Sequence, residues 1–324
     1  MKLAVAQKVT SEMSDLVRSK LGGKVEIEYL ASADTGDRQH ILSEADILLG
    51  MNLRRDIHDD EYEYLKKVRL IQITLAGADG IPFERFRHEI TICSNSGAYN
   101  EPIAEHAIGM MLALSRNFLP NHQKLTRGIF DQVTRHKMLS GATLGVIGFG
   151  GIGKATAELA RGFRMKILAI NSTGKTDRQV DFIGKLPDMD YLLRESDFIL
   201  LSIALNKQTK SLIGSEELGK MKRDAVLVNV ARGDLIDERS LYEHLKSLPQ
   251  FKAGIEAWWV EPFSRPKFEV HYPFFELENF LGSPHNSYLV DGIYLRALEH
   301  ALENILRYLN GGALLNVQRR EDYT

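Results

Sequence analysis

Cysteine is almost absent from this 324-residue chain, in which Cys93 is the single example. One cysteine excludes an intramolecular disulfide framework and a zinc site built from cysteines, and we predict no metal site. Cys93 ends the apolar run 90–93, so we expect a buried strand residue rather than a catalytic thiol.

Long apolar runs and an excess of one charge are lacking as well. No stretch reaches the ~18 apolar residues of a membrane span, and the first residues read as a short strand rather than a signal peptide. The chain has 41 lysine and arginine residues against 43 aspartate and glutamate residues, a net charge of -2. With this balance, the protein has no net positive charge that would attract it to nucleic acid or to an anionic membrane. We therefore expect a cytoplasmic protein that acts on small molecules, with no nucleic acid and no membrane as partner.

Short apolar runs alternate with amphipathic segments along most of the chain, which predicts an α/β fold with parallel sheets. The expected strands of the first half are 3–6, 25–29, 47–49, 70–74 and 90–93. After residue 143 the alternation resumes, with expected strands 144–147, 165–170, 198–203, 225–230 and 252–257. The expected helices are 102–119, which stops before Pro120, 215–221, 238–247 and 292–309. Two doubly wound sheets are implied.

A glycine-rich turn joins one apolar run to an alanine-rich helical stretch, at Gly148, Gly150 and Gly153. Such a turn, between a strand and a helix of a βαβ unit, cradles the pyrophosphate of a dinucleotide against the helix N-terminus. The alternative is a turn that serves packing alone.

The next strand ends at Asn171, where an NAD site usually offers a carboxylate to the adenosine ribose. Ser172, Thr173, Lys175 and Arg178 follow and supply hydroxyls and positive charge. This loop favours NADP over NAD, although Asn171 is compatible with NAD and the two cations are equally consistent with solvated loop charges.

Arg232, Glu261 and His285 each follow a strand-like run, where ligands bind in open α/β sheets. A guanidinium there can hold a carboxylate or carbonyl oxygen, and histidine suits proton transfer near neutrality. Glu261 is placed to hydrogen-bond the imidazole and stabilise its charged form. The alternatives are a structural arginine and a solvated glutamate.

Four separated motifs occur in one order: 148–153 (GFGGIG), 229–233 (NVARG), 261–262 (EP) and 283–285 (SPH). In this order they resemble the D-isomer-specific 2-hydroxyacid dehydrogenases. The resemblance extends over nearly the whole chain through residues 75–79, 95–105, 139–144 and 315–317. It implies a Rossmann dinucleotide-binding domain, residues 100–286, inserted into a flavodoxin-like substrate domain formed by residues 1–99 and 287–324.

The resemblance also implies roles for individual residues. His285 would be the general acid and base, Glu261 its partner, and Arg232 the residue that orients a 2-oxo acid. Backbone groups around Ala76, Gly77 and Ala78 would hold the substrate carboxylate, and a plain turn is the alternative for these three. The implied cofactor contacts are Gly148, Phe149, Gly150, Gly151, Ile152, Gly153, Asn171, Ser172, Thr173, Lys175, Ala204, Val230, Ala231, Glu256 and His285. The family also implies a homodimer formed through residues 100–140.

The chain departs from the family pattern at several positions. Glu256 replaces the usual aspartate near the nicotinamide amide, and Ala204 replaces a common proline. Trp258, Trp259 and Tyr288 stand where smaller residues are usual, and either narrow the pocket or pack in the core.

Several related activities compete. Glu261 argues against formate as substrate and Ala76 against phosphite, so short 2-oxo acids such as glyoxylate or hydroxypyruvate are the first expectation. Arg54 and Arg55 either reach an anionic substrate tail or are exposed charges. The alternative of another class is a catalytically weak NAD(P)-binding interaction or regulatory protein of the same fold.

Overall fold

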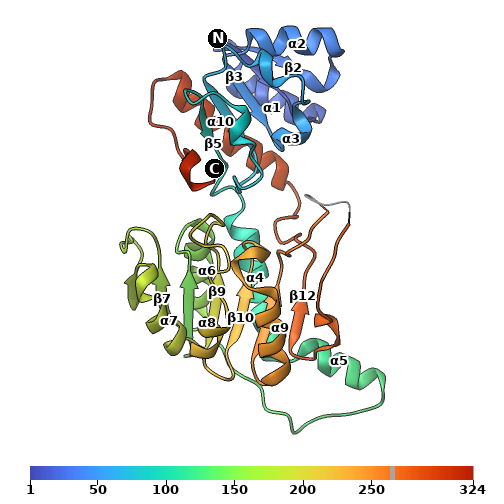
Figure 1. The fold of residues 1–324 in the computed structure, drawn as a ribbon, viewed down its shortest axis with the longest axis vertical. Helices are drawn as coiled ribbons and strands as arrows, with labels where there is room; N and C mark the ends of the chain where they lie inside the picture. Colours follow the sequence, from blue (N-terminus) through green and yellow to red (C-terminus); the bar gives the residue numbers. More distant parts are fainter. Residues whose placement is uncertain (263–266, 324) are drawn as a thin grey trace. The chain divides into compact units, whose positions relative to one another are not determined.

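The computed structural model describes residues 1–262 and 267–323, and the chain forms two compact units (Figure 1). The first unit contains residues 1–99 together with the segment that begins at Asp291. The second contains residues 100–290. Ser287, which the sequence analysis assigned to the first unit, donates its N–H to Glu256 Oε1 of the second at 2.9 Å.

The first unit is built on a parallel five-stranded sheet with the order β2-β1-β3-β4-β5. This is the flavodoxin-like order that the sequence predicted. Its strands are β1 (Lys2–Val5), β2 (Glu26–Tyr29), β3 (Ile47–Gly50), β4 (Leu70–Ile73) and β5 (Thr91–Cys93). Its helices are α1 (Ser11–Leu21), α2 (Thr35–Glu44), α3 (Leu53–Asp56) and α10 (Ile293–Leu309).

Helices cover both faces of this sheet because their apolar residues recur on one side. Val17 and Leu21 of α1 join Leu298 and Leu302 of α10 in one core cluster, which packs on one face. Leu42 of α2 belongs to the cluster on the opposite face. Within β5, Cys93 is fully buried, and burial raises the pKa of its thiol to about 11. The expected position of this cysteine, buried in a strand, is therefore confirmed.

The second unit is built on a parallel seven-stranded sheet with the order β12-β11-β10-β9-β6-β7-β8. The strands are β6 (Thr143–Ile147), β7 (Lys166–Ile170), β8 (Phe182–Gly184), β9 (Phe198–Leu201), β10 (Val226–Asn229), β11 (Lys252–Ile255) and β12 (Phe280–Gly282). The chain order reverses between β6 and β9, as in a Rossmann sheet. The predicted fold class, two doubly wound parallel α/β sheets, is thus confirmed.

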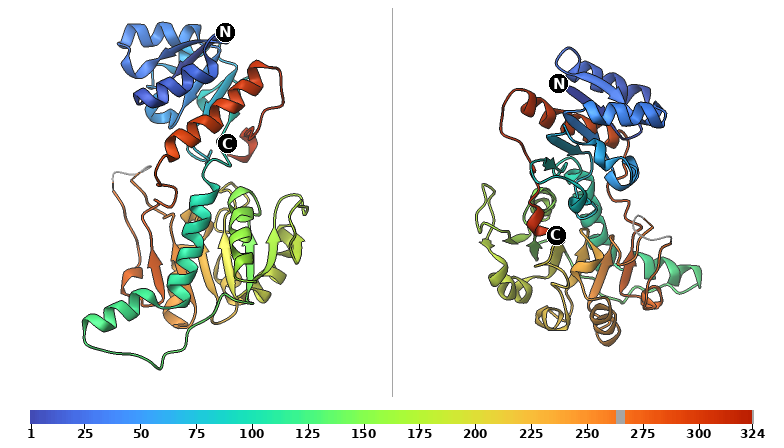
Figure 2. Two further views of the ribbon diagram at one scale, coloured as in Figure 1. Left: turned by 180° about the vertical axis from the view of Figure 1, so that it is seen from behind. Right: turned by 45° about the horizontal axis from the view of Figure 1, so that its top comes forward.

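Helices of the second unit lie on both faces of its sheet (Figures 1 and 2). They are α4 (Asn100–Ser115), α5 (Phe118–Thr126), α6 (Gly151–Gly162), α7 (Met189–Glu195), α8 (Ser215–Lys220) and α9 (Glu238–Ser247). The helices α4 and α6 pack side by side on one face, whereas α7, α8 and α9 cover the other. The prediction for residues 238–247 matches α9, whose N-cap Asp237 accepts a hydrogen bond from Ser240 N at 2.8 Å.

The expected single helix over residues 102–119 is wrong at its end. Its first part, α4, stops at Ser115, and Asn117 takes the left-handed conformation with φ of 52°. Asparagine tolerates that conformation better than most residues, and the chain then begins α5 in a new direction. Pro120 does not end a helix, because it is the third residue of α5, where no intrahelical N–H bond is lost.

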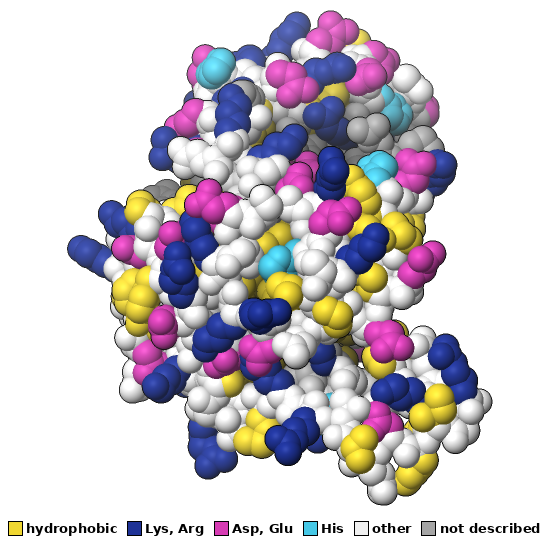
Figure 3. Space-filling view, turned by 60° about the horizontal axis from the view of Figure 1, so that its bottom comes forward, with side chains coloured by type: hydrophobic (Ala, Val, Ile, Leu, Met, Phe, Trp, Pro, Cys, Tyr) yellow, Lys and Arg dark blue, Asp and Glu magenta, His cyan; other side chains and the backbone are white. Residues whose placement is uncertain are grey.

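The segment from α5 to residue 138, which we call the arm, extends beyond the β12 edge of the second unit (Figures 1 and 2). Within the arm, Lys124 pairs with Asp131 at 2.9 Å, and the backbone N–H of Lys137 donates to Ser115 O of α4 at 3.2 Å. Many of its large apolar side chains are nevertheless exposed, and yellow side chains gather on the protruding lobe in Figure 3. Among the described residues, no helix is both long and apolar enough to cross a membrane.

Candidate active site

The turn between β6 and α6 demands glycine at two positions. Gly148 has φ of +101°, and a Cβ there would lie 2.4 Å from the backbone nitrogen of Ile203. A Cβ on Gly153 would lie 2.8 Å from Val146 Cγ1, so its absence lets α6 pack closely on β6. A Cβ on Gly150, by contrast, would meet nothing within 4 Å. Open space therefore lies beside the first turn of α6.

That first turn presents backbone donors to the open space. The first helical bond runs from Lys154 N to Gly150 O at 2.9 Å, so the N–H groups of residues 151–153 have no acceptor within the helix. Phe149 is buried and its N–H donates to Ile170 O at 2.8 Å, so its side chain serves the packing of the turn. Three N–H groups at the positive end of a helix suit a pyrophosphate.

The glycine turn lies at the point where the strand order reverses. Ser202, directly after β9, donates its hydroxyl to Gly148 O at 2.9 Å and so joins the loops that follow β6 and β9. In open α/β sheets the ligand crevice lies at this point, outside the carboxyl ends of the strands. Ala204, Val230 and Ala231, which were predicted to contact the cofactor, follow β9 and β10 at the same edge.

Asn171 shapes the loop after β7. Its Oδ1 accepts hydrogen bonds from Thr173 N at 3.1 Å and Gly174 N at 2.7 Å, while its Nδ2 donates to Lys175 O at 2.8 Å. This asparagine turn leaves Ser172, Thr173 and Lys175 exposed at the carboxyl end of β7. The amide of Asn171 therefore acts first on the loop itself.

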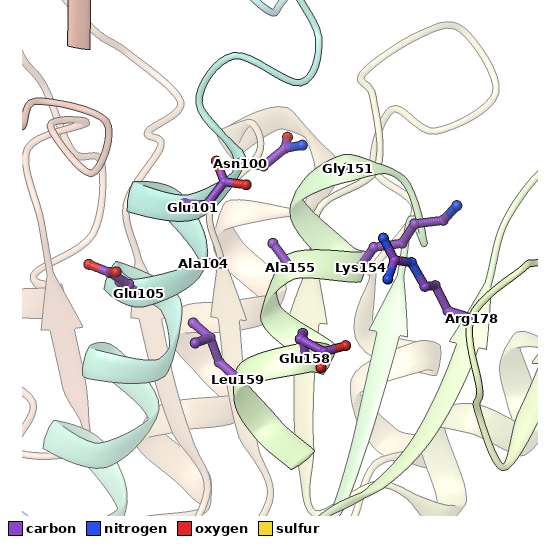
Figure 4. Close-up of a pocket in the computed structure, with 10 residues that line it drawn as sticks. All are labelled: Asn100, Glu101, Ala104, Glu105, Gly151, Lys154, Ala155, Glu158, Leu159 and Arg178. Atoms are coloured by element: carbon purple, nitrogen blue, oxygen red, sulfur yellow. The ribbon is translucent and has the colours of Figure 1, made fainter. Parts of the chain in front are cut away.

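A pocket of about 340 Å³ lies between α4 and α6 of the second unit (Figure 4). Lys154 and Arg178 lie at one end of it, and Glu101 and Glu105 project from α4 at the other. The ammonium of Lys154 pairs with Asp177 at 2.7 Å, which lowers the pKa of that carboxyl. The sequence analysis missed Lys154, although its place directly after Gly153 puts it on the first turn of the helix.

The structure brings His285 and Glu261 together. His285 Nδ1 lies 2.8 Å from Glu261 Oε1 and 2.9 Å from Oε2, and both side chains are largely buried. The backbone of His285 is left-handed, with φ of 51°, and its N–H donates to Glu256 O at 3.0 Å. An imidazole whose Nδ1 contacts a carboxylate is held in one orientation, with Nε2 on the opposite side of the ring.

Glu256 is fully buried directly after β11. Its Oε1 accepts the N–H of Ser287 at 2.9 Å, whereas its Oε2 has no hydrogen-bond partner among the described residues. A buried carboxylate oxygen without a donor is costly, so this atom suits a ligand that brings an N–H group. The extra methylene of Glu256 does not prevent the side chain from lying in the core.

The segment that carries Arg232 lies against the segment that leads to Glu261. Asn229 fixes the backbone, because its Nδ2 donates to Arg232 O at 2.8 Å and its Oδ1 accepts Ala231 N at 3.0 Å. A Cβ on Gly233 would lie 2.3 Å from the carbonyl carbon of Trp258. Arg232, Glu261 and His285 thus follow three adjacent strands, β10, β11 and β12.

The two tryptophans pack mainly inside the second unit. Trp258 is 7% exposed and contacts Phe268 edge-on with ring centroids 5.0 Å apart. Trp259 stacks on Phe274 at 5.6 Å. Their bulk therefore contributes to an aromatic cluster, and Tyr288 is half-buried in the loop after His285.

The predicted substrate residues Ala76, Gly77 and Ala78 belong to the first unit, in the loop that follows β4. Arg54 donates its Nε to Gly80 O of the same loop at 3.2 Å and lies 3.7 Å from Glu84. Arg55 is exposed. Ligand-binding loops of open sheets occupy this edge, so the placement suits the expected role.

Comparisons with known proteins agree with this geometry. Residues 108–287 match the family described as D-isomer specific 2-hydroxyacid dehydrogenase, NAD binding domain. The chain is 33% identical to hydroxypyruvate reductase of Thermotoga maritima, over 85% of this chain and 87% of that protein. It is 28% identical to glyoxylate reductase of Korarchaeum cryptofilum, over 97% and 95%. Among solved structures, an acyclic imino acid reductase in complex with NADPH and D-Arg matches with a TM-score of 0.77 at 25% identity, over 98% and 100%.

The Rossmann sheet, its glycine turn and the histidine–glutamate pair define an oxidoreductase that uses a nicotinamide dinucleotide. The chain belongs to the D-isomer-specific 2-hydroxyacid dehydrogenase family.

Substitutions at two glycines distinguish the contribution of the turn to folding stability from its contribution to cofactor binding. We expect Gly148→Ala to lower the free energy of unfolding by about 2 kcal/mol or more, because of its φ and the collision with Ile203. Gly150→Ala should change that free energy by less than about 1 kcal/mol yet weaken cofactor binding at least tenfold. Urea unfolding and cofactor fluorescence titration measure the two effects. Equal cofactor affinity in Gly150→Ala and wild type would contradict the assigned position of the pyrophosphate.

Proposed function

We propose that the protein reduces short 2-oxo acids to D-2-hydroxy acids with NADPH, with glyoxylate and hydroxypyruvate as the first candidates. The contact of His285 Nδ1 with Glu261 at 2.8 Å carries the proposal, because it prepares an imidazole for proton transfer at the carboxyl edge of the sheet. The names of the relatives, hydroxypyruvate reductase and glyoxylate reductase, support this substrate class.

His285 acts as the general acid of the reduction. Glu261 holds Nδ1, so the proton moves from Nε2 to the oxygen of the substrate carbonyl. The bound nicotinamide cofactor supplies the hydride to the carbonyl carbon. In the reverse direction His285 takes the proton back from the hydroxyl, and Glu261 stabilises the resulting imidazolium.

Arg232 orients the substrate and stabilises charge on its oxygen. Its backbone is fixed by Asn229, which is fully buried, so its guanidinium starts from a defined position. Residues 100–286 form the dinucleotide-binding domain of this proposal, and residues 1–99 with 287–324 form the substrate domain. In the substrate domain, the backbone of Ala76, Gly77 and Ala78 binds the substrate carboxylate, since small side chains permit close approach.

The residues of the second unit fit a nicotinamide dinucleotide. The open space at Gly150 and the donors of residues 151–153 suit the pyrophosphate. Glu256 Oε2, which has no hydrogen-bond partner in the described part of the chain, suits the carboxamide N–H₂ of the nicotinamide. These groups would hold the pyrophosphate and the carboxamide of the cofactor.

The loop after β7 favours NADPH over NADH. Lys154, Lys175 and Arg178 bring three cations to this region, where Asp177 pairs with Lys154 at 2.7 Å and Glu158 lines the same pocket. Asn171 offers no carboxylate that would repel a 2′-phosphate, and it exposes Ser172 and Thr173 as hydroxyl donors.

A homodimer formed through the arm is the proposed assembly. The arm exposes apolar side chains that monomers rarely leave in water, at Phe118, Leu119, Leu125, Ile129, Phe130, Val133 and Met138. Phe130 is 75% and Val133 88% exposed, so their burial in a partner would contribute directly to association. The cytoplasmic location expected from the sequence stays a prediction.

Loss of the general acid should strongly lower the turnover rate without weakening the binding of the cofactor. We expect His285→Gln to lower kcat for glyoxylate reduction by about 10²–10⁴-fold, and Arg232→Ala to lower kcat/KM strongly, each with nearly unchanged Kd for NADPH. His271→Gln is the matched control, because His271 also pairs with a glutamate, Glu238, at 2.6 Å but on the surface. The reaction is followed by the absorbance of NADPH at about 340 nm, where the reduced cofactor absorbs. Wild-type activity in His285→Gln would refute the site.

Exchange of Asn171 for aspartate should move the preference toward NADH. The new carboxylate still accepts the N–H groups of Thr173 and Gly174 but loses the bond from Nδ2 to Lys175 O, and it repels a 2′-phosphate. We expect the ratio of kcat/KM for NADPH over NADH to fall about tenfold or more. Lys175→Gln should lower the same ratio while leaving NADH unaffected. An unchanged ratio in both variants would contradict the assignment of this loop.

Charge placed on the arm should break the dimer. We expect wild type to sediment as a dimer and the double variant Phe130→Asp, Val133→Asp to sediment as a monomer, since two buried charges would oppose association. Tyr191→Asp, at a 49% exposed aromatic on α7, is the control that should stay dimeric. A monomeric wild type would end this part of the proposal.

A further inference from the structure

Trp258 lies where the three segments of the candidate site meet. Its backbone N–H donates to Glu261 Oε1 at 2.7 Å, and its indole Nε1 donates to Ser283 O at 2.7 Å. Its carbonyl carbon is the atom that a Cβ on Gly233 would meet at 2.3 Å. One residue therefore contacts the glutamate, the loop of His285 and the loop of Arg232.

The loop of His285 needs such anchoring because its conformation is strained. A histidine with φ of 51° lies in the left-handed region, which costs free energy unless surrounding contacts hold it. The N–H of His285 is fixed on Glu256 O at 3.0 Å and the N–H of Ser287 on Glu256 Oε1 at 2.9 Å. The indole bond to Ser283 O fixes the loop on the other side of the histidine.

The indole ring itself has little freedom to move. It packs edge-on against Phe268 at 5.0 Å and Phe280 at 5.9 Å, and Phe275 lies at 5.6 Å. A Cβ on Gly282 would lie 2.8 Å from its Cζ2, so the ring is pressed against the strand that leads to His285. The direction of the indole N–H is therefore set by packing.

We propose that Trp258 is a positioning residue for proton transfer. Its indole N–H holds the loop of His285 in the position at which the Nδ1 atom of His285 meets Glu261. The same residue holds Glu261 through its backbone N–H, so one residue contacts both the glutamate and the loop of the histidine. A phenylalanine at this position would keep a ring in the cluster but could not make the indole bond. This inference rests on the proposed function and deepens it.

Trp259 offers a matched control. Its indole donates to Ile236 O at 2.7 Å, and its ring stacks on Phe274 with an interplanar angle of 9°. Both tryptophans thus combine one carbonyl acceptor with aromatic packing. Only the acceptor of Trp258 belongs to the loop of His285.

The experiment compares Trp258→Phe with Trp259→Phe in steady-state reduction of glyoxylate by NADPH from pH 5 to 10, a range chosen to span histidine titration. For Trp258→Phe we expect kcat to fall about fivefold to tenfold with little change in KM for NADPH, the effect of one misplaced hydrogen bond. The alkaline limb of the kcat/KM profile should also move, because a displaced His285 no longer meets Glu261 in the same geometry. Glu256 contacts the same segment and is unchanged in both variants. Trp259→Phe should lower Tm without moving the limb.

A profile of Trp258→Phe that superimposes on wild type, or one that Trp259→Phe reproduces, would overturn the inference. If Trp258→Phe fails to fold, Gly282→Ala is the second variant, because its Cβ would push the indole edge away from Ser283 and should shift the same limb. Failure of the proposed function itself is distinguishable. In that case wild type would reduce neither glyoxylate nor hydroxypyruvate, and no profile would exist to compare.

Discussion

The parallel alignment of β10, β11 and β12 is the constraint on which the candidate site depends. Adjacent parallel strands lie ~4.8 Å apart and end at the same edge, so the loops that follow them begin as neighbours. The three strands end at Asn229, Ile255 and Gly282, and Arg232, Glu261 and His285 follow within a few residues. Residues separated by more than 50 positions in the chain therefore reach one edge without any long connection crossing the sheet.

Buried polar residues at the strand ends convert this proximity into defined geometry. Asn229 and Glu256 are both fully buried, and each hydrogen-bonds the backbone of a neighbouring loop. Burial of a polar group is unfavourable unless its hydrogen bonds are made, so these side chains hold the loops firmly in the one arrangement that satisfies them. Glu256 Oε2 is the exception, because among the described residues this buried oxygen has no hydrogen-bond partner.

The sequence predicts the parts of this molecule that depend on local patterns. Strand periodicity and the glycine turn specify most strands of both sheets, and the predicted range 238–247 equals that of α9, whose N-cap is Asp237. The strands β8 and β12 are not among the expected strands. Each has three residues, which is too short to show an alternating pattern. The break at Asn117 is held by Lys252, whose ammonium donates to Leu114 O and to Asn117 Oδ1, and this contact joins residues more than 130 positions apart. The pair of Lys154 with Asp177 joins residues 23 positions apart and depends on the fold being formed.

Large aromatic residues at 258 and 259 depend on small residues elsewhere. The indole of Trp258 fits because Gly282 has no Cβ, and its backbone approaches the loop of Arg232 because Gly233 has none. The indole ring thus makes its hydrogen bond to Ser283 O beside two glycines at which a Cβ would lie 2.8 Å or less from an atom of Trp258. Because both glycines flank the candidate catalytic residues, a substitution at either would displace the aromatic ring and the site together. The same few residues therefore determine both the core packing and the geometry of the candidate site at this edge of the sheet.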